Sequence, residues 1–271
     1  PLRCEWCHNP ECISGRPQIY FIEEKCAKCA RCFDVCPEGA ISLERKQRIN
    51  WRRCILCMRC IGVCPNRALT QVGYMVEPEV VMEEVESDCL FYNNSGGGLT
   101  VSGGEPFSQF DFLKDLFKLA RKKNISTALD TSGYVEWKKF KEILDDIDLV
   151  LYDIKHIDPT KHKQKTGVSN KRILENAKRI AKISQIKLAM RIPIIPGFND
   201  SNAELRDIAT FIKSIRVKHV DLLPYHRYAT KKYTMLGMKY KLAKVREYTD
   251  QEKENLKKIF ESYDFQVSIG G

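Results

Sequence analysis

The chain has 271 residues, of which 43% are hydrophobic and 30% charged, so it can bury a substantial core and needs no cross-links to fold. Its net charge is +10, but the basic residues are spread over many segments with acids interleaved, which argues against nucleic acid as the partner. No stretch approaches the ~20 uninterrupted apolar residues of a membrane span. We expect a soluble, cytoplasmic protein with one main domain and a small insert, and no membrane partner.

The first strong signal is a cysteine pattern that occurs twice between residues 26 and 64. Each copy reads C-x2-C-x2-C-x3-C-P. This is the ligand spacing of a two-cluster bacterial ferredoxin, in which the cysteine before the proline ligates the neighbouring cluster. The pattern therefore predicts two [4Fe–4S] clusters and a protein that moves single electrons. The predicted ligand sets are Cys26, Cys29, Cys32 and Cys64 for one cluster, and Cys54, Cys57, Cys60 and Cys36 for the other.

Two other readings of these cysteines fit less well. Zinc favours two C-x2-C pairs with a longer spacer, and a third cysteine two residues further on suits a tetrahedral ion poorly. Disulfides belong to oxidising compartments, whereas the chain shows no apolar leader segment that would carry it to one. We expect Cys12 and Cys89, which lie outside the pattern, to be small buried apolar groups.

From residue 99 onward, short β-rich runs alternate with amphipathic helical stretches, which predicts a parallel sheet built from βα repeats. The predicted strands are 99–102, 126–130, 149–153, 186–192, 220–223 and 266–269. Between them, apolar residues recur at the helical period of 3.6 in the stretches 112–120, 140–147, 173–181 and 205–212. We interpret these stripes as core.

Polar residues recur just after the predicted strands. Ligands of parallel α/β sheets bind at the carboxyl ends of the strands, so these residues form the candidate site. Taken singly, Asp130 can cap a helix and His226 can be a structural histidine. Their recurrence at one edge favours a ligand site. The runs are Gly103-Gly104-Glu105-Pro106, Asp130-Thr131-Ser132-Gly133, Asp153-Ile154-Lys155, Arg191-Ile192-Pro193 and Leu223-Pro224-Tyr225-His226.

These motifs carry a family resemblance over essentially the whole chain. PLRCEWCHNPE, the doubled cysteine pattern, SGGGLTVSGGEP, LDTSG, YDIK, RIPIIPGFND and LLPYH follow one another in this order. Together they resemble the radical S-adenosylmethionine (SAM) activating enzymes of glycyl radical enzymes, in the subgroup with a two-cluster insert that is related to the pyruvate formate-lyase activating enzyme. The resemblance implies an α/β fold. Its expected architecture is a partial (open) radical SAM (β/α)6-type barrel with a small bacterial-ferredoxin-like insert. The implied domains are 1–20 for the start of the core, 21–72 for the insert and 73–271 for the rest of the barrel.

The start of the chain departs from the family pattern. The family binds its catalytic cluster with C-x3-C-x2-C, and here the sequence begins one residue after the expected first cysteine. The preceding strand of the family's barrel is absent as well. We therefore expect a chain that is truncated within the motif. Cys12 is an alternative third ligand, although its spacing does not match.

The resemblance also implies roles for the candidate residues. Three thiolates leave one iron of the catalytic cluster open for SAM, and Gly103, Gly104 and Glu105 resemble the motif that receives its amino group. For Lys155 and Arg191 the simpler alternatives are a surface lysine and a structural ion pair. The other implied roles are catalytic cluster ligation by Cys4 and Cys7, with Trp6 beside them; a monovalent cation site at Asp130, Thr131 and Asp153; and contacts of Lys155, Arg191 and His226 with cofactor or substrate.

The implied reaction is cleavage of SAM to a 5′-deoxyadenosyl radical, which removes a Cα hydrogen from a glycine of a partner glycyl radical enzyme. The implied class is an activating enzyme of the formate C-acetyltransferase type, active under anaerobic conditions. Flavodoxin or ferredoxin is the implied electron donor, and the insert is expected to relay electrons. Two alternatives remain open: a radical SAM enzyme acting on another peptide or a small molecule, and a ferredoxin-type electron carrier.

Overall fold

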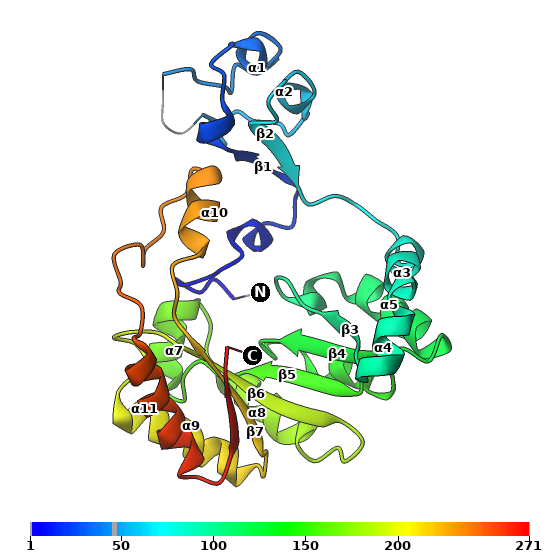
Figure 1. The fold of residues 1–271 in the computed structure, drawn as a ribbon, viewed down its shortest axis with the longest axis vertical. Coiled ribbons are helices and arrows are strands. Elements are labelled where there is room, and N and C mark those ends of the chain that lie inside the picture. The colour runs from blue at the N-terminus through cyan, green and yellow to red at the C-terminus, as the bar shows by residue number, and fades with distance from the viewer. Residues whose placement is uncertain (1, 45–47, 271) are drawn as a thin grey trace. The chain divides into compact units, whose positions relative to one another are not determined.

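The computed structural model describes residues 2–44 and 48–270, and the chain divides into two compact units (Figure 1). The first unit comprises Pro1–Glu5, Val76–His226 and Val245–Gly271, and the second comprises Trp6–Met75 and Arg227–Lys244. The second unit thus contains the predicted insert, 21–72, together with residues on both sides of it and one segment from far along the chain.

The first unit is built on a sheet of six parallel strands whose order, β3-β4-β5-β6-β7-β8, follows the chain. β3 and β8 lie at the two edges, so the sheet is open, and the predicted fold class is confirmed. The strands are β3 (Gly98–Val101), β4 (Ser126–Thr131), β5 (Leu149–Asp153), β6 (Lys187–Ile194), β7 (His219–Pro224) and β8 (Gln266–Ile269).

All six strands were predicted, and two of them, β5 and β8, have the predicted bounds. The largest difference is at β6, which runs two residues past its expected end, through Pro193. Its pairing with β5 ends at Arg191, so beyond that point β6 pairs with β7 alone. A proline is tolerated there because the side of the strand facing β5 needs no further backbone donor.

Amphipathic helices follow most of the strands. The predicted apolar stripes are buried in α5, α8 and α9, which pack against the sheet as core helices. The stretch 140–147 was predicted as one helical stripe but forms two short pieces, α6 and a 3₁₀ turn, η4. The helices of this unit are α3 (Pro78–Ser87), α4 (Cys89–Ser95), α5 (Phe110–Lys122), α6 (Trp137–Lys141), α7 (Pro159–Thr166), α8 (Lys171–Ile180), α9 (Asn202–Ser214) and α11 (Asp250–Glu261), with the 3₁₀ turns η3 (Pro106–Gln109) and η4 (Leu144–Asp146).

The second unit contains an antiparallel pair, β1 (Gln18–Phe21) and β2 (Leu69–Val72), and two one-turn helices, α1 (Arg31–Asp34) and α2 (Arg59–Gly62). It also holds the 3₁₀ turns η1 (Pro10–Ile13) and η2 (Glu23–Lys25), and the distant helix α10 (Ala229–Met235). Lys232 of α10 donates to Asn9 Oδ1 and Glu11 Oε1, and Trp51 Nε1 donates to Leu236 O at 2.8 Å. These bonds explain why the segment Arg227–Lys244 packs with the cysteine-rich region.

The cysteine loops of this unit are a structural repeat with an offset of 28 residues, the separation of Cys26 from Cys54. Left-handed backbone conformations recur at the same offset, so both copies of the motif fold the same way. The pairs are Lys28 (φ 55°) with Leu56 (φ 57°) and Ala30 (φ 63°) with Met58 (φ 60°).

None of the helices in the described part of the chain has the length and apolar character that crossing a membrane requires.

Gly133, just after β4, offers a test of this packing. Its φ is +69°, and an added Cβ would lie 1.8 Å from the hydroxyl of the fully buried Tyr152. We expect Gly133→Ala to lower the free energy of unfolding by about 3 kcal/mol, from left-handed strain and overpacking together. Gly167→Ala is the matched control, because its φ is +87° with nothing near the added Cβ; strain alone costs about 1 kcal/mol. Urea titration measures both, and equal losses would contradict the packing of Tyr152 against Gly133.

Candidate functional site

The carboxyl ends of β3, β4, β5 and β6 bring polar side chains together at one edge of the sheet in the first unit. Asp153, the last residue of β5, lies in register with Arg191 of β6. Asp130 and Thr131 end β4, while Glu105 follows β3 by four residues. We call this edge, with Lys155, the polar rim.

Glu105 is fixed at the rim by three hydrogen bonds from the end of β4. Its Oε1 accepts from Thr131 Oγ1 at 2.7 Å, and its Oε2 accepts from both the backbone N–H (3.1 Å) and the hydroxyl of Ser132. These bonds hold the carboxylate in one orientation, as a site for an amino group requires.

The two glycines before Glu105 are exposed, and the backbone of Gly103 has a φ of +112°, which favours glycine. A Cβ built on Gly103 would meet nothing within 4 Å. The backbone is therefore open to a ligand at this point, which fits the close approach expected for SAM.

Asp130 at the end of β4 and Arg191 of β6 form an ion pair, although β5 lies between their strands. Arg191 Nη1 lies 2.5 Å from Asp130 Oδ2, and the same oxygen accepts from Ser102 Oγ at 2.7 Å. Both side chains are largely buried. The pairing matches the structural reading of Arg191, and it leaves other guanidinium N–H groups of Arg191 available for a further contact.

Lys155 is buried, with 7% of its surface exposed, and its Nζ donates to Asp153 Oδ2 at 2.6 Å. The alternative reading of Lys155 as a surface lysine is therefore wrong. Burial lowers the pKa of Lys155, but the negative charges of Asp153, Cys4 and Glu105 outweigh it, and the net shift is upward. Lys155 is thus a fixed cation that interacts with two carboxylates of the rim, Asp153 and Glu105, and with Cys4.

Cys4 is held in the first unit by the backbone on either side of it. Arg3 N donates to Thr166 O and Glu5 N donates to Lys165 O, both in the last turn of α7, and Lys165 Nζ pairs with Glu5. These bonds fix the chain at Cys4, and the negative charge of its thiolate raises the pKa of Lys155.

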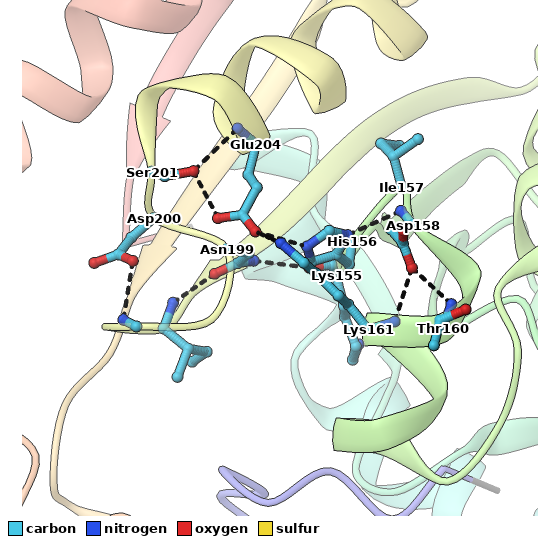
Figure 2. Close-up of polar contacts among 12 residues, drawn as sticks. Lys155, His156, Ile157, Asp158, Thr160, Lys161, Asn199, Asp200, Ser201 and Glu204 are labelled. Carbon is cyan, nitrogen blue, oxygen red and sulfur yellow. Dashed lines mark hydrogen bonds and ion pairs between the residues drawn. The ribbon is translucent and has the colours of Figure 1, made fainter.

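His156 connects Lys155 to α9, as Figure 2 shows. Its Nδ1 accepts from Asp158 N at 2.9 Å, so Nε2 carries the proton and donates to Glu204 Oε1 at 3.2 Å. Glu204 also accepts from Lys161 Nζ (2.5 Å) and Ser201 Oγ (2.7 Å). The network fixes the backbone on the carboxyl side of Lys155.

Asn199 holds the other side of the same loop (Figure 2). It is fully buried; its Oδ1 accepts from Ile195 N, and its Nδ2 donates to Lys155 O and Pro193 O, each at 2.8 Å. One side chain thereby ties the loop after β6 to the backbone carbonyl of Lys155. Loss of these bonds would free the carbonyl and leave buried groups unpaired.

The other predicted residues differ in their burial. His226 follows β7 and is half-buried, and burial lowers its pKa although Glu247 raises it. Trp6 is buried and Cys7 half-buried in the second unit. Cys12 is exposed, so its interpretation as a buried apolar group is wrong, whereas Cys89 packs at the edge of a cluster around Met82 and Leu116.

The expected cation site at Asp130, Thr131 and Asp153 stays a prediction. Each of these side chains already has a partner: Arg191 for Asp130, Glu105 for Thr131 and Lys155 for Asp153. Within residues 2–44 and 48–270, no three His, Cys, Asp or Glu side chains are grouped so that they could hold a single metal ion. A monovalent cation would therefore compete with the two ion pairs.

Two cavities of the second unit are each bordered by four cysteines. The first cavity has Cys26, Cys29, Cys32 and Cys64 in its lining. The second cavity has Cys36, Cys54, Cys57 and Cys60. Each takes three cysteines from one copy of the motif and the fourth from the other. A cubane is ligated at four separate irons, so cysteines that surround a space, rather than converge on a point, fit a [4Fe–4S] cluster.

Backbone donors point at the fourth sulfur of each cavity. Ala40 N donates to Cys36 Sγ and Ala68 N donates to Cys64 Sγ, both at 3.2 Å. Such bonds stabilise thiolates and occur at the same place in both copies of the repeat.

Comparison with known proteins agrees with this geometry. The Radical SAM superfamily matches residues 51–212, and the 4Fe-4S dicluster domain matches residues 18–65. The trans-4-hydroxy-L-proline dehydratase activating enzyme of Clostridioides difficile is 39% identical over 100% of this chain and 91% of its own length. The isethionate sulfite-lyase activating enzyme of Nitratidesulfovibrio vulgaris is 41% identical over 90% of this chain and 82% of its own.

Among solved structures, a domain of a pyruvate-formate lyase-activating enzyme from Bacteroides vulgatus is 28% identical, with a TM-score of 0.54 over 65% of this chain and 99% of that one. Fold, rim and cavities thus define a radical SAM enzyme that uses SAM and [4Fe–4S] clusters, with a dicluster domain for additional clusters. Within this class, the chain belongs to the activating enzymes of glycyl radical enzymes.

The sequence reasoning included Ser132 in the candidate site without a role, and it missed three residues that fix the backbone near the rim: His156, Asn199 and Glu204. One of them had a readable signal, because S-x-x-E at 201–204 is a capping-box pattern at the start of α9. Ser201 does cap α9, accepting from Glu204 N at 3.3 Å. That Glu204 also binds His156 depends on how β5 and β6 are paired, which the local pattern does not contain.

The acid sensitivity of the first unit tests the Glu204 network. Burial raises the pKa of Glu204, but hydrogen bonds from Lys161, Ser201 and His156 lower it to about 2, from 4.5. A carboxylate with a lowered pKa stabilises the fold above about pH 4.5, and this stabilisation is lost as the pH falls towards 2. We expect the difference in unfolding free energy between the wild type and Glu204→Gln to shrink by about 2 kcal/mol between about pH 5.5 and pH 3.

Urea titrations of the iron-free chain at the two pH values measure this difference. Glu175→Gln, an exposed carboxylate on α8, is the matched control. A difference between wild type and Glu204→Gln that does not change with pH would contradict the network of Figure 2.

Proposed function

We propose that the polar rim of the first unit binds SAM and that the two cavities of the second unit bind the two additional [4Fe–4S] clusters. Cys4 and Cys7 are the proposed protein ligands of the catalytic cluster, with Trp6 beside them. When bound, the cluster and SAM supply a 5′-deoxyadenosyl radical, which removes a hydrogen atom from a glycine of the partner enzyme. The chain's own residues bind, orient and shield these groups.

The chemistry of each rim group suits one part of SAM. Glu105, fixed by Thr131 and Ser132, accepts from the amino group, and the open backbone at Gly103 and Gly104 lets the cofactor approach. Lys155 neutralises the carboxylate as a buried point charge. Arg191 and His226 face the cofactor or the substrate peptide. No side chain of the rim needs to act as a general acid or base, because a hydrogen atom is transferred rather than a proton.

The observation that carries the proposal is the convergence of Glu105, which follows β3 and is held by the end of β4, with Asp153 and Lys155 at the end of β5. A buried cation that interacts with two carboxylates is the arrangement that an amino acid carrying both charges requires. An electron carrier would need none of these groups, so the rim argues against a ferredoxin-type function.

The partner is a glycyl radical enzyme, and we propose that it is a dehydratase or lyase rather than formate C-acetyltransferase. Two relatives, at 39% and 41% identity, are named for dehydratase and sulfite-lyase partners. The domain of the pyruvate-formate lyase-activating enzyme, which represents the formate C-acetyltransferase type, is 28% identical. The formate C-acetyltransferase type is thus the less supported assignment.

Three further expectations belong to the same proposal. Flavodoxin or ferredoxin, acidic electron carriers, would dock on a chain of net charge +10. The enzyme would work in the cytoplasm, where thiols stay reduced. Residues 1–20 and 73–271 would serve the radical chemistry, and 21–72 would serve electron supply.

Product formation under anaerobic conditions tests the function. The chain is prepared with a cysteine added before Pro1, which completes C-x3-C-x2-C, and loaded with iron and sulfide. We expect release of 5′-deoxyadenosine on addition of SAM and reductant, and a glycine-centred doublet in electron paramagnetic resonance when a dehydratase or lyase partner is present. Release of 5′-deoxyadenosine without any doublet, across candidate partners of both kinds, would contradict the assigned partner class.

Lys155→Met tests the rim directly. Removal of a buried charge-assisted contact of about 1.5–3 kcal/mol raises the dissociation constant for SAM by about 10- to 100-fold. Lys161→Met is the matched control, since Lys161 is an exposed lysine of the same network. Equilibrium binding of radiolabelled SAM gives both constants, and equal constants for wild type and Lys155→Met would show that the cofactor lies elsewhere.

A further inference from the structure

A buried arginine borders the first cavity. Arg48 is 6% exposed, and its Nη2 donates to Cys26 Sγ at 3.3 Å. Its Nη1 donates to the carbonyl oxygens of Ser42 (3.1 Å) and Leu43 (3.0 Å), and its guanidinium lies over the ring of Phe21. The side chain is therefore held in one position against the sulfur of a predicted cluster ligand.

The charge of Arg48 is left largely uncompensated by its partners. These partners are two carbonyls and a thiol, without a carboxylate, and in the described part of the chain its Nε has no hydrogen-bond partner. A buried cation is costly unless an anion faces it. A [4Fe–4S] cluster held by four thiolates carries net negative charge, so a cluster in the first cavity would supply that anion.

The second cavity differs from the first at the corresponding places. The 28-residue repeat pairs most of the lining of the two cavities, but Tyr20, which corresponds to Arg48, is not in the lining of the second cavity, and that lining has no arginine or lysine. In addition, Asn66 of the first cavity corresponds to Glu38 of the second. Thus the lining of the first cavity includes a cation that the lining of the second lacks, and it has an amide where the second has an exposed carboxylate.

Both differences act in the same direction on a bound cluster. The reduction potential of an iron–sulfur cluster rises with hydrogen bonds to its sulfurs and with nearby positive charge, because reduction adds one negative charge. We infer that Arg48 makes the two additional clusters unequal: the cluster of Cys26, Cys29, Cys32 and Cys64 has the higher reduction potential and is the first of the two to be reduced. This inference rests on the ligand sets given under the proposed function.

A redox titration followed by electron paramagnetic resonance tests the inference. The full chain carries Cys7→Ala, so that the signals of the two additional clusters are observed without the catalytic one. An iron content of about eight and two midpoint potentials are expected. Fewer than eight irons, or a single cluster signal, would contradict the ligand sets themselves, which separates that failure from a failure of the role of Arg48.

In this background, Arg48→Met should lower one midpoint and leave the other unchanged. We expect at least a tenfold change in the equilibrium constant for reduction, which is 59 mV for one electron. Arg48→Lys, which keeps the charge, should recover much of the shift. Arg31→Met is the matched control, because Arg31 adjoins Cys32 but is exposed, and its charge is screened by water.

Unchanged midpoints in Arg48→Met, or an equal shift in Arg31→Met, would overturn the inference. Arg48→Gln, which keeps a donor without the charge, guards against loss of the cluster. If neither Arg48→Met nor Arg48→Gln retains about eight irons, Arg48 serves assembly of the cavity, and its assignment to the reduction potential is overturned as well.

Discussion

The architecture of the candidate active site depends on the parallel pairing of β3 to β6. Because all four strands run the same way, their carboxyl ends meet at one edge, and residues far apart in the chain become neighbours. Asp153 and Arg191 lie opposite each other in the β5–β6 register. Had one strand been antiparallel, its rim residue would lie at the other end of the sheet.

The rim is rigid because its charged groups are paired and a second layer fixes their backbone. Asp153 binds the side chain of Lys155. Asn199 binds the carbonyl of Lys155, while His156 and Glu204 fix the next turn of the loop (Figure 2). The second unit uses a different device, a duplicated loop that encloses two cysteine-lined cavities. Rigid surroundings suit both radical chemistry and electron transfer, since neither tolerates a mobile or open site.

The sequence predicted the features that depend on the spacing and periodicity of residues close together in the chain. Strand positions, the core stripes of α5, α8 and α9, and the grouping of the cysteines into two sets of four follow from spacing and periodicity. It did not predict contacts that depend on strand register, such as Thr131 with Glu105 or Asp130 with Arg191. Nor did it predict that α10 would pack with the cysteine-rich unit, because Lys232 and Glu11 are more than two hundred residues apart.

The central claim is that the strand ends of the first unit hold SAM against the catalytic cluster. The most direct test is the electron paramagnetic resonance spectrum of the reduced, iron-loaded chain bearing a cysteine before Pro1, recorded with and without SAM. The account predicts that SAM changes the signal of the catalytic cluster in the wild type and changes it little in Glu105→Gln. A wild-type spectrum that SAM leaves unaltered would contradict the claim.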